Sequence, residues 1–310
     1  MFSSSETMLD LSIVIVNYRS WPKLENCLHS LHPEKQKTKK IIVVDNNSGD
    51  NILDRFIEKF PWVDWVKNDI NAGFAAGCNL GAEKVTTQWM LFLNPDTRLQ
   101  RDCLPTLISY CDQHPDFHLI TIKQTDEKGN NTHPYGIFPN AWNSNGLVRS
   151  LQRFLLLPDQ TKKALSSNKI GFPHWISGSF VLLRKEHFEL LGGWDEKFWM
   201  YFEDVDLCKR AADNGLSRIL LNQWECLHYH GVSSRGDNKT KILTKKEVIK
   251  SHHKYIEKNF VGKNRKLAHR WLMIQKITEL TVLGAFDKTK KAMLKKLKPF
   301  WHQMFSSTDI

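Results

Sequence analysis

The chain has 310 residues and a formal net charge of +11, with 41% hydrophobic and 25% charged residues. Those fractions are typical of a soluble globular protein that buries a full core, as one large domain or two smaller ones. The sequence has no run of 18 apolar residues and no basic segment followed by an apolar one at its N-terminus, so neither a membrane-spanning helix nor a secretory signal is predicted.

The first part of the chain alternates predicted strands and helices. Short apolar runs rich in β-branched residues predict buried strands at 11–16, 40–44, 62–68 and 90–93. Helical spacing predicts helices at 22–32 and 50–60, and a Gly-rich loop that opens a helix at 72–85. This order predicts a doubly wound, mainly parallel sheet.

The second part is less regular. Residues 124–170 have weak periodicity and many Asn, Pro and Gly residues, which predicts an irregular insertion over the cleft. The apolar run 175–183 predicts a further strand, and a short helix follows at 184–191. A helix at 203–214 is expected to end at a glycine, before a short strand at 218–221 that residues 226–230 follow.

The positive charge lies near the C-terminus. Residues 239–298 contain 18 Lys and Arg against 4 Asp and Glu, whereas the rest of the chain is slightly acidic. Apolar residues there fall near one helical face among many lysines. This composition suits a helix on an anionic membrane surface, and it equally suits a solvated face packed on the rest of the protein. We expect a catalytic domain over 1–237 and a basic, mostly helical segment over 238–310.

Three aspartates lie where α/β sheets place ligands. Asp45 ends the second predicted strand, Asp96 follows the fourth within Asn94-Pro95-Asp96, and Asp204 follows an aromatic run. Together they predict one cleft with a nucleotide contact, a divalent-cation ligand and a general base. The alternatives are a capping or Asx turn at Asp45, an ordinary turn at Asp96 and an acidic helix N-terminus at Asp204.

Two further motifs are less specific. The stretch Asn71–Gly81 has glycines that allow close backbone approach, but it is not a phosphate-binding P-loop. His228 and His230 point the same way if they lie on a strand, so a metal or phosphate contact and a structural role both stay open. No cysteine or further histidine is near them, so a zinc site is not expected. The six cysteines form no Cys-x-x-Cys pair and are expected to be reduced thiols in the cytoplasm.

Together, these motifs resemble glycosyltransferase family 2, the inverting nucleotide-sugar transferases of the GT-A fold, and more narrowly its bacterial rhamnosyltransferase-like branch. The resemblance covers about residues 10–237. It rests on Ser12-Ile-Val-Ile-Val-Asn-Tyr18, Val43-Val-Asp-Asn-Asn-Ser48, Asn71-Ala-Gly-Phe-Ala-Ala-Gly-Cys-Asn79, Asn94-Pro-Asp96, Gly192-Gly-Trp-Asp-Glu196, Glu203-Asp-Val-Asp-Leu207 and His228-x-x-Gly-x-Ser233. It implies an α/β fold with a mixed, mainly parallel sheet flanked by helices, and a basic helical C-terminal extension.

The resemblance also implies residue roles. Asp45 would contact a pyrimidine base. Asn71 and Asn79 would help to hold the nucleotide, although the family often has Arg at the position of Asn79. The residues that the resemblance assigns to substrate binding are Asn17, Tyr18, Asp45, Asn71, Asn79, Trp194 and Glu203.

The metal and the base are assigned in the same way. Asp96 matches the last carboxylate of the family's D-x-D motif, whose first Asp is Asn94 here. His228 keeps the family's H-x-x-G-x-S spacing, which His230 does not, and so matches its metal or diphosphate histidine. The implied cofactor is Mg²⁺ or Mn²⁺. Asp204 matches the catalytic base.

The implied protein is a metal-dependent, inverting hexosyltransferase of cell-surface polysaccharide synthesis, cytoplasmic and peripheral on the inner face of the cell membrane. It would move a sugar, with dTDP-rhamnose as the favoured donor and a UDP-hexose as the alternative, to a hydroxyl of a saccharide or lipid-linked acceptor. A nucleotidyltransferase is disfavoured because Asn17-Tyr18-Arg19-Ser20 is not a Gly-rich basic loop. A nucleic-acid partner is not expected, because no recognised binding motif occurs.

Overall fold

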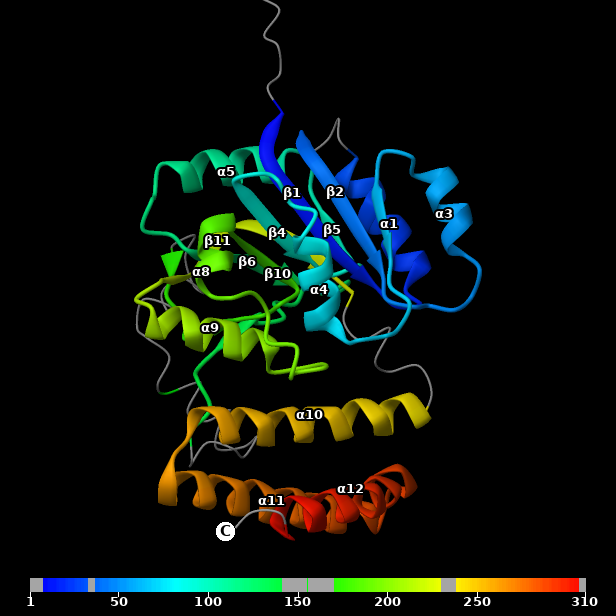
Figure 1. The fold of residues 1–310 in the computed structure, drawn as a ribbon, viewed down its shortest axis with the longest axis vertical. Helices are drawn as coiled ribbons and strands as arrows, with labels where there is room; N and C mark the ends of the chain where they lie inside the picture. The colour runs from blue at the N-terminus through cyan, green and yellow to red at the C-terminus, as the bar shows by residue number, and fades with distance from the viewer. Residues whose placement is uncertain (1–7, 33–36, 141–154, 156–169, 230–237, 307–310) are drawn as a thin grey trace, which may run out of the picture. The chain divides into compact units, whose positions relative to one another are not determined.

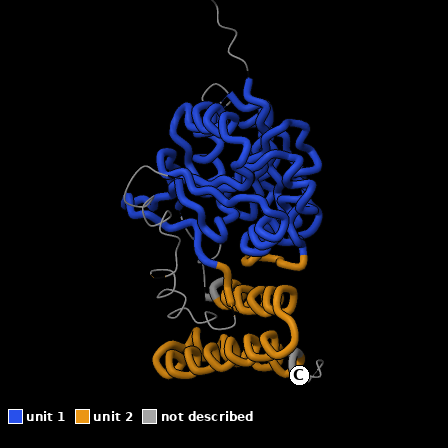
Figure 2. Tube along the Cα trace, turned by 90° about the vertical axis from the view of Figure 1, so that its left-hand side faces the viewer, with its two compact units in different colours: residues 1–137, 157–196, 203–233 blue, residues 138–156, 197–202, 234–310 orange. Residues whose placement is uncertain are grey.

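The computed structural model describes residues 8–32, 37–140, 155, 170–229 and 238–306. The chain divides into two compact units (Figure 2). Unit 1 comprises residues 1–137, 157–196 and 203–233, and unit 2 comprises residues 138–156, 197–202 and 234–310. Most of the predicted insertion, and His230 with the rest of its motif, lie outside the described residues.

Unit 1 is built on a mixed sheet with the described strand order β3-β2-β1-β4-β10-β6-β11-β5, with β8 beside β11 (Figure 1). Its strands are β1 (Leu9–Asn17), β2 (Thr38–Asp45), β3 (Asp64–Lys67), β4 (Trp89–Leu93), β5 (Thr97–Leu99), β6 (Leu119–Thr125), β8 (Ile170–Gly171), β10 (Phe180–Arg184) and β11 (Arg218–His228). A second sheet pairs β7 (Tyr135–Gly136) with β9 (Trp175–Ile176). The strands β1 to β4 are parallel neighbours, as their continuous apolar runs predict.

The later strands differ from the sequence-based expectation. The run 175–183 is two strands, β9 and β10, because Ser177-Gly178-Ser179 interrupts it. Residues 218–228 form a single strand, β11, whose pairing with β6 shifts in register between Leu221 and Glu225. Strands β5 and β6 were not predicted, and both help to shape the site described below.

Helices cover both faces of this sheet. They are α1 (Trp21–Leu31), α3 (Leu53–Lys59), α4 (Phe74–Ala82), α5 (Cys103–Asp112), α8 (Lys185–Leu190) and α9 (Glu203–Asp213). Side chains of α1, α3 and α5 share one core with alternate strand residues such as Ile13, Ile15 and Leu91. Complete burial of one such side chain contributes about 1.5–3 kcal/mol. All six cysteines are buried and unpaired.

Helix α4 packs on the opposite face through two glycines. A Cβ atom at Gly77 would lie 2.8 Å from Val16 Cγ1, and one at Gly81 would overlap Val14 Cγ1 and lie 3.1 Å from Val44 Cγ2. The glycine spacing that the sequence offered as a close-approach signal therefore brings α4 directly onto β1 and β2.

We expect Gly81→Ala to destabilise unit 1, although alanine is the better helix former by about 1 kcal/mol. The added methyl group must displace β1 or α4, and overpacking of this kind costs about 1–3 kcal/mol. Urea unfolding followed by tryptophan fluorescence measures the change, with Ala76→Gly as a control for helix propensity alone. A more stable Gly81→Ala protein would contradict the close packing.

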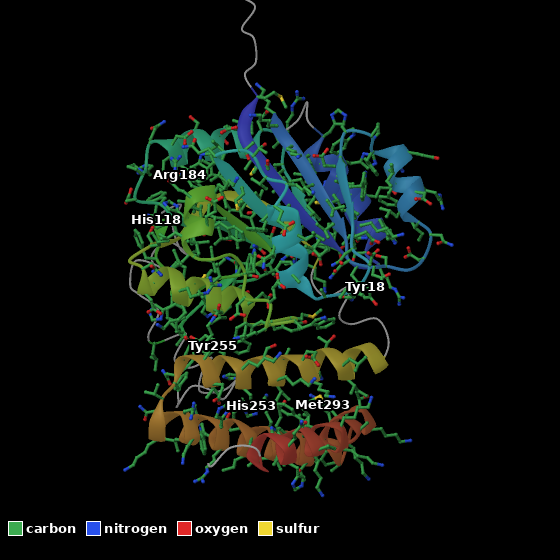
Figure 3. All side chains as sticks on the ribbon, viewed as in Figure 1. Tyr18, His118, Arg184, His253, Tyr255 and Met293 are labelled. Carbon is green, nitrogen blue, oxygen red and sulfur yellow. The ribbon has the colours of Figure 1, made fainter. Side chains whose placement is uncertain are left out.

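Unit 2 is dominated by three helices, α10 (Asn238–Asn259), α11 (Gly262–Gly284) and α12 (Lys288–Ser306). They share a small apolar core that includes Ile249, Leu280, Met293, Leu297 and Trp301, and Figure 3 labels Met293 and His253 among these helices. The short segment 197–202 belongs to the same unit. Within it, Phe202 stacks on His252 of α10 at a ring distance of 4.6 Å.

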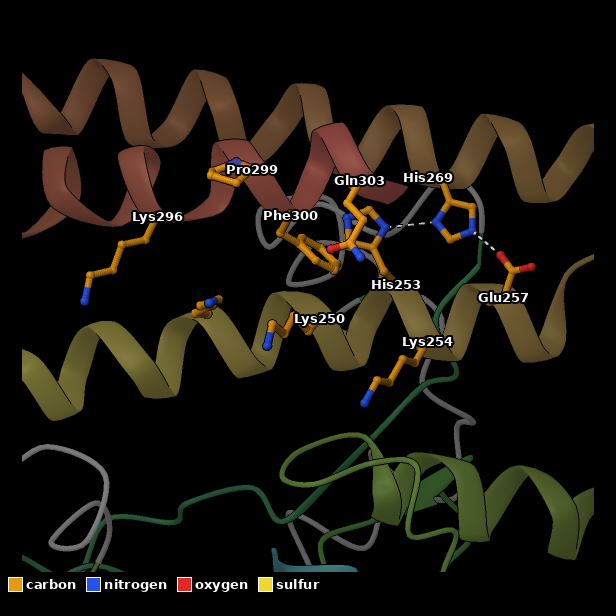
Figure 4. Close-up of a pocket in the computed structure, with 10 residues that line it drawn as sticks. Lys250, His253, Lys254, Glu257, His269, Lys296, Pro299, Phe300 and Gln303 are labelled. Carbon is orange, nitrogen blue, oxygen red and sulfur yellow. Dashed lines mark hydrogen bonds and ion pairs between the residues drawn. The ribbon is translucent and has the colours of Figure 1, made fainter. Parts of the chain in front are cut away.

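A chain of hydrogen bonds crosses the helices of unit 2 (Figure 4). Trp301 Nε1 donates to His253 Nε2 over 3.1 Å, so His253 carries its proton on Nδ1. That proton is donated to His269 Nδ1 over 2.9 Å, and His269 Nε2 then donates to Glu257 Oε2 over 2.9 Å. Each imidazole uses one ring nitrogen as an acceptor and the other as a donor, so this chain of hydrogen bonds forms only when both histidines are neutral. Burial lowers the pKa of His253 to about 3, and burial also lowers the pKa of His269.

We therefore expect unit 2 to lose stability in acid. The unfolded histidines bind protons below their ordinary pKa of 6.5, whereas the folded ones stay neutral down to lower pH. The free energy of unfolding therefore has its full value above pH 6.5. Below that pH it falls by about 1.4 kcal/mol for each pH unit and for each of the two histidines, until the folded histidine also binds a proton. Denaturant unfolding between pH 7.5 and 5 checks this. His269→Gln should flatten the pH dependence, whereas the exposed-site control His302→Gln should not.

Candidate active site

The carboxyl ends of β1 and β2 bring together two residues predicted to bind nucleotide. Asn17 and Asp45 are register partners, and Asn17 Nδ2 donates to Asp45 Oδ1 over 3.4 Å. Both are buried. Asp45 Oδ1 also accepts from Ser48 Oγ over 2.5 Å. The Ser48 amide also donates to Asp45 Oδ2 over 3.3 Å, so both oxygens of the carboxylate are held by local hydrogen bonds at the strand end.

The residues around this pair include some that the sequence-based reasoning did not select. Tyr18 is half-buried beside Asn17, with the Arg19 guanidinium 5.2 Å from its ring centroid (Figure 3). Arg19 Nε donates to the Ser48 carbonyl over 2.8 Å, which ties the two strand ends together. The predicted Asn71 accepts from Asn46 Nδ2 over 3.0 Å, so Asn46 links Asn71 to the end of β2.

Asn79 and Trp194 hold a loop together. Asn79 Nδ2 donates to the Trp194 carbonyl and Asn79 Oδ1 accepts from the Trp194 amide, each over 2.9 Å. Asn79 Nδ2 also donates to Glu196 Oε1 over 2.8 Å. The Trp194 ring is buried against Phe74 and Phe92. These contacts place both residues as supports for the Gly192–Glu196 loop, and their predicted contact with substrate stays a prediction.

Asp96 and His228 meet because of strand pairing. The unpredicted strand β5 starts directly after Asp96 and pairs antiparallel with the end of β11, with Thr97 opposite His228. The Tyr229 amide also donates to the Asp96 carbonyl over 2.9 Å. As a result, Asp96 Oδ1 lies 3.3 Å from His228 Nε2, and both side chains are nearly fully buried.

The surroundings of His228 fit a metal ligand. Its Nδ1 lies 2.8 Å from Gln124 Oε1, which can only accept, so Nδ1 is the donor. In neutral His228 the Nε2 lone pair then faces the Asp96 carboxylate, and a cation would satisfy both groups. One carboxylate and one imidazole are a donor set that Mg²⁺ or Mn²⁺ accepts beside phosphate oxygens. No group of three such ligands occurs within the described ranges.

Asp204 lies in the first turn of α9, and both of its oxygens accept hydrogen bonds. Val205 N donates to Oδ1 over 2.8 Å, and Gly178 N donates to Oδ2 over 3.2 Å. Burial raises the pKa of Asp204, and those two backbone bonds oppose the rise. Burial and the neighbouring Asp204 raise the pKa of Glu203 well above its usual range. Burial thus raises the pKa of both adjacent carboxyls, and the hydrogen bonds from Gly178 and Val205 oppose that rise at Asp204.

Hydrogen bonds made by two adjacent residues connect Asp204, the predicted base, with the surroundings of the predicted cation ligand His228. The first is Gly178, whose amide contacts Asp204. The next residue, Ser179, accepts from the Asn94 amide through its carbonyl over 3.0 Å. Ser179 Oγ also donates to Gln124 Oε1 over 2.9 Å, the oxygen that accepts from His228. The Ser177–Ser179 loop thus contacts Asp204, the predicted base. It also contacts Asn94 and Gln124, which lie beside the predicted cation ligands Asp96 and His228.

The sequence-based reasoning missed Gln124 and the Ser177–Ser179 turn. Two signals were available. A Ser-Gly-Ser sequence inside an apolar run is typical of a turn. Gln124 also comes just after Leu119-Ile120-Thr121-Ile122, a run typical of a buried strand, and a polar residue in such a strand needs a partner.

We expect Gln124→Leu to weaken Mn²⁺ binding by about 10- to 100-fold, because His228 loses the acceptor that orients it. Gln124→Glu keeps an acceptor and should retain most of the affinity. Titration of free Mn²⁺ by electron paramagnetic resonance measures both, with the exposed Gln88→Leu as control. Equal affinity in Gln124→Leu and the wild type would show that Gln124 does not orient His228.

Comparison with known proteins identifies a family and several relatives. The model of glycosyl transferase family 2 matches residues 12–190, more than half of the chain. The chain is 25% identical over 266 residues to N-acetylglucosaminyl-diphospho-decaprenol L-rhamnosyltransferase of Mycobacterium tuberculosis (strain CDC 1551 / Oshkosh), covering 79% of this chain and 81% of the relative. It is 24% identical over 265 residues to rhamnosyltransferase WbbL of Escherichia coli (strain K12), covering 82% and 95%.

Solved structures show the same fold. GalNAc-T7 with UDP, GalNAc and Mn²⁺ matches with a TM-score of 0.57 at 15% identity, over 84% of this chain and about half, 54%, of that one. TarS residues 1–349 of S. aureus with UDP matches with a TM-score of 0.50 at 14% identity, over 86% and 72%. The mixed sheet with flanking helices is thus the GT-A fold of these glycosyltransferases. The family match, together with these relatives, shows that the chain belongs to glycosyl transferase family 2 and is rhamnosyltransferase-like.

Proposed function

We propose that this glycosyltransferase is a metal-dependent, inverting rhamnosyltransferase that uses dTDP-rhamnose and a lipid-linked saccharide acceptor. The observation that carries the chemistry is the loop Ser177–Ser179, which bonds to Asp204 and, through Gln124, supports His228. The same loop thereby fixes the position of Asp204, the proposed base, and supports His228, a proposed metal ligand. The donor and acceptor are proposed from the two rhamnosyltransferase relatives, which match most of the chain.

The mechanism follows from the charges at the site. Asp204 takes the proton of an acceptor hydroxyl, and that oxygen attacks the anomeric carbon. The bond from this carbon to the diphosphate oxygen breaks, its electron pair leaves with the nucleoside diphosphate, and the configuration inverts. Asp96 and His228 would hold a divalent cation, which would neutralise the charge that develops on the leaving group. Asp45 and Asn17, buried at the strand ends, are proposed to position the nucleoside.

A thermal-shift screen of nucleotide sugars with Mn²⁺ tests the donor. We expect dTDP-rhamnose to raise the melting temperature more than UDP-hexoses, and product analysis with a diphosphate-linked saccharide then checks transfer and inversion. A larger shift with a UDP-hexose, followed by transfer of that hexose, would replace the proposed donor. Retained configuration in the product would exclude the single-displacement mechanism.

We also propose peripheral contact between unit 2 and an anionic membrane surface. In the chain as described, no helix is both long and apolar enough to cross a bilayer. Helix α11 exposes Trp271 and Ile274 on one face, and Phe286 after it is 91% exposed. Helix α12 contributes lysines to a groove of about 1090 Å³, to which α11 contributes Met273 and Ile277. Apolar side chains among lysines suit a negatively charged interface.

Flotation of the full chain with vesicles tests this contact. The protein should float with anionic phosphatidylglycerol vesicles and not with neutral ones, and Phe286→Glu should abolish flotation. Leu190→Glu, at an exposed leucine of unit 1, is the matched control. Equal flotation of both variants would assign the contact to another surface.

A further inference from the structure

Unit 2 contains a cavity of about 670 Å³ with four lysines in its walls (Figure 4). Lys246, Lys250 and Lys254 recur every four residues, so they lie along one face of α10. Lys296 is contributed by α12. The cavity is therefore positively charged on two of its walls.

Two of these lysines have partners outside the cavity lining. Lys250 Nζ lies 2.9 Å from Glu247 Oε1, and Lys254 Nζ donates to the Lys197 carbonyl over 2.6 Å. The ammonium groups of Lys250 and Lys254 are thus already engaged by other groups of the protein.

The lining itself does not neutralise the remaining charge. Glu257 is the one carboxylate among the described lining residues, and it already contacts Arg265 Nη1 at 3.0 Å and His269 Nε2 at 2.9 Å. Over the stretches that the structure describes, Lys246 and Lys296 form no salt bridge or hydrogen bond with protein. The cavity thus has two lining lysines whose charge no neighbouring carboxylate of the described chain offsets.

The histidines form a preorganised back wall but add no charge. The directed chain from Trp301 through His253 and His269 to Glu257 uses the ring nitrogens of both imidazoles. Phe300 packs edge-on against His253 at 5.7 Å, which makes part of the wall apolar. Three like charges at four-residue spacing destabilise an isolated helix. A bound anion with several charges would offset that repulsion.

We propose that this cavity binds a diphosphate group. Ammonium groups are strong phosphate binders, and a diphosphate offers enough oxygens to contact several of them at once. The volume lies in the range of small-ligand sites, which disfavours an extended nucleic acid. The diphosphate can be soluble or carried by a lipid, and both share this recognition chemistry. The proposal does not depend on the transfer reaction, whose residues lie in unit 1.

Calorimetric titration of the full chain with inorganic pyrophosphate in EDTA tests the site, because EDTA removes any contribution from the Asp96–His228 pair. We expect wild-type protein to show a saturable site. The double variant Lys246→Gln/Lys296→Gln should bind at least about tenfold more weakly, since each charged hydrogen bond contributes appreciably. Lys246→Arg/Lys296→Arg should restore binding.

The matched control is Lys263→Gln/Lys266→Gln, which removes the same charge from α11 outside the cavity lining. Asp96→Ala should bind pyrophosphate like the wild type. The absence of a saturable site in wild-type protein would overturn the proposal. Equal weakening in the cavity and control variants would do so too, because it would indicate nonspecific charge attraction. Tighter binding of a single-stranded oligonucleotide than of pyrophosphate would instead favour a nucleic-acid site.

Flotation with neutral vesicles that contain a polyprenyl diphosphate distinguishes the two sources. If the ligand is carried by a lipid, wild-type protein should float with these vesicles, and added pyrophosphate should displace it. The double variant Lys246→Gln/Lys296→Gln should then not float. If the ligand is soluble, calorimetry should detect saturable pyrophosphate binding, and the protein should not float with these vesicles. Each result supports the diphosphate site and assigns its source.

Discussion

Asp204→Asn is expected to reduce sugar transfer by about 100- to 10,000-fold while nucleotide binding stays near the wild-type level. The amide cannot accept the proton of the acceptor hydroxyl, but it can still accept the backbone bond from Gly178 that positions the side chain. Single-turnover transfer and calorimetric titration with nucleoside diphosphate measure the two effects separately. Asp213→Asn, on the exposed end of the same helix, is the matched control.

The pH profile gives a second test of this base. Burial raises the pKa of Asp204 above its ordinary 3.8, so the carboxylate becomes protonated at a higher pH than in an exposed aspartate. A general base must be deprotonated, and activity should therefore fall as the pH drops through that raised pKa. Burial and Asp204 raise the pKa of Glu203, which favours its protonated form, and Glu203→Gln imitates that form. Transfer lost in Glu203→Gln but retained in Asp204→Asn would reverse the assignment of the base.

Asp96→Ala should weaken nucleoside diphosphate binding in excess Mn²⁺ by about 10- to 100-fold, the range found even for residues that only orient metal ligands. The variant removes the one carboxylate of the pair and leaves His228 with no opposing charge at 3.3 Å. Calorimetry with and without Mn²⁺ measures the loss.

Two controls locate this effect at the metal. In EDTA, Asp96→Ala and the wild type should bind nucleotide equally, because the cation bridge is absent from both. Asp102→Ala, at the start of α5, removes an exposed carboxylate of the same part of the chain. A wild-type affinity of Asp96→Ala in excess Mn²⁺ would exclude Asp96 as a metal ligand.

Local patterns were sufficient for much of unit 1. The continuous apolar runs at 11–16 and 40–44 are buried in β1 and β2, because such runs bury side chains on both sheet faces. The glycines at 77 and 81 predicted close approach, and the structure shows α4 packed on Val14 and Val16. Period and residue size act over a few residues, so they can be read without the fold.

The position of Asp45, Asp96 and Asp204 at strand or helix ends was visible in the same way. Their order along the chain matched the family, and the family model confirms that membership. Their partners were not visible. Ser48 holds Asp45, Gly178 holds Asp204 and Gln124 orients His228, and two of these three contacts join residues more than 25 positions apart.

The sequence by itself therefore determined the fold family, the strand-end carboxylates and the basic C-terminal helices, because these depend on local periodicity, composition and motif spacing. Only the tertiary structure decided which side chains meet. Strand β5 pairs with β11 and so brings Asp96 to His228, and the Ser177–Ser179 turn connects Asp204 with Gln124. The lysine cavity of unit 2 likewise exists only where α10 and α12 contribute to one lining. Long-range pairing depends on the packing of the whole chain, and no local pattern encodes it.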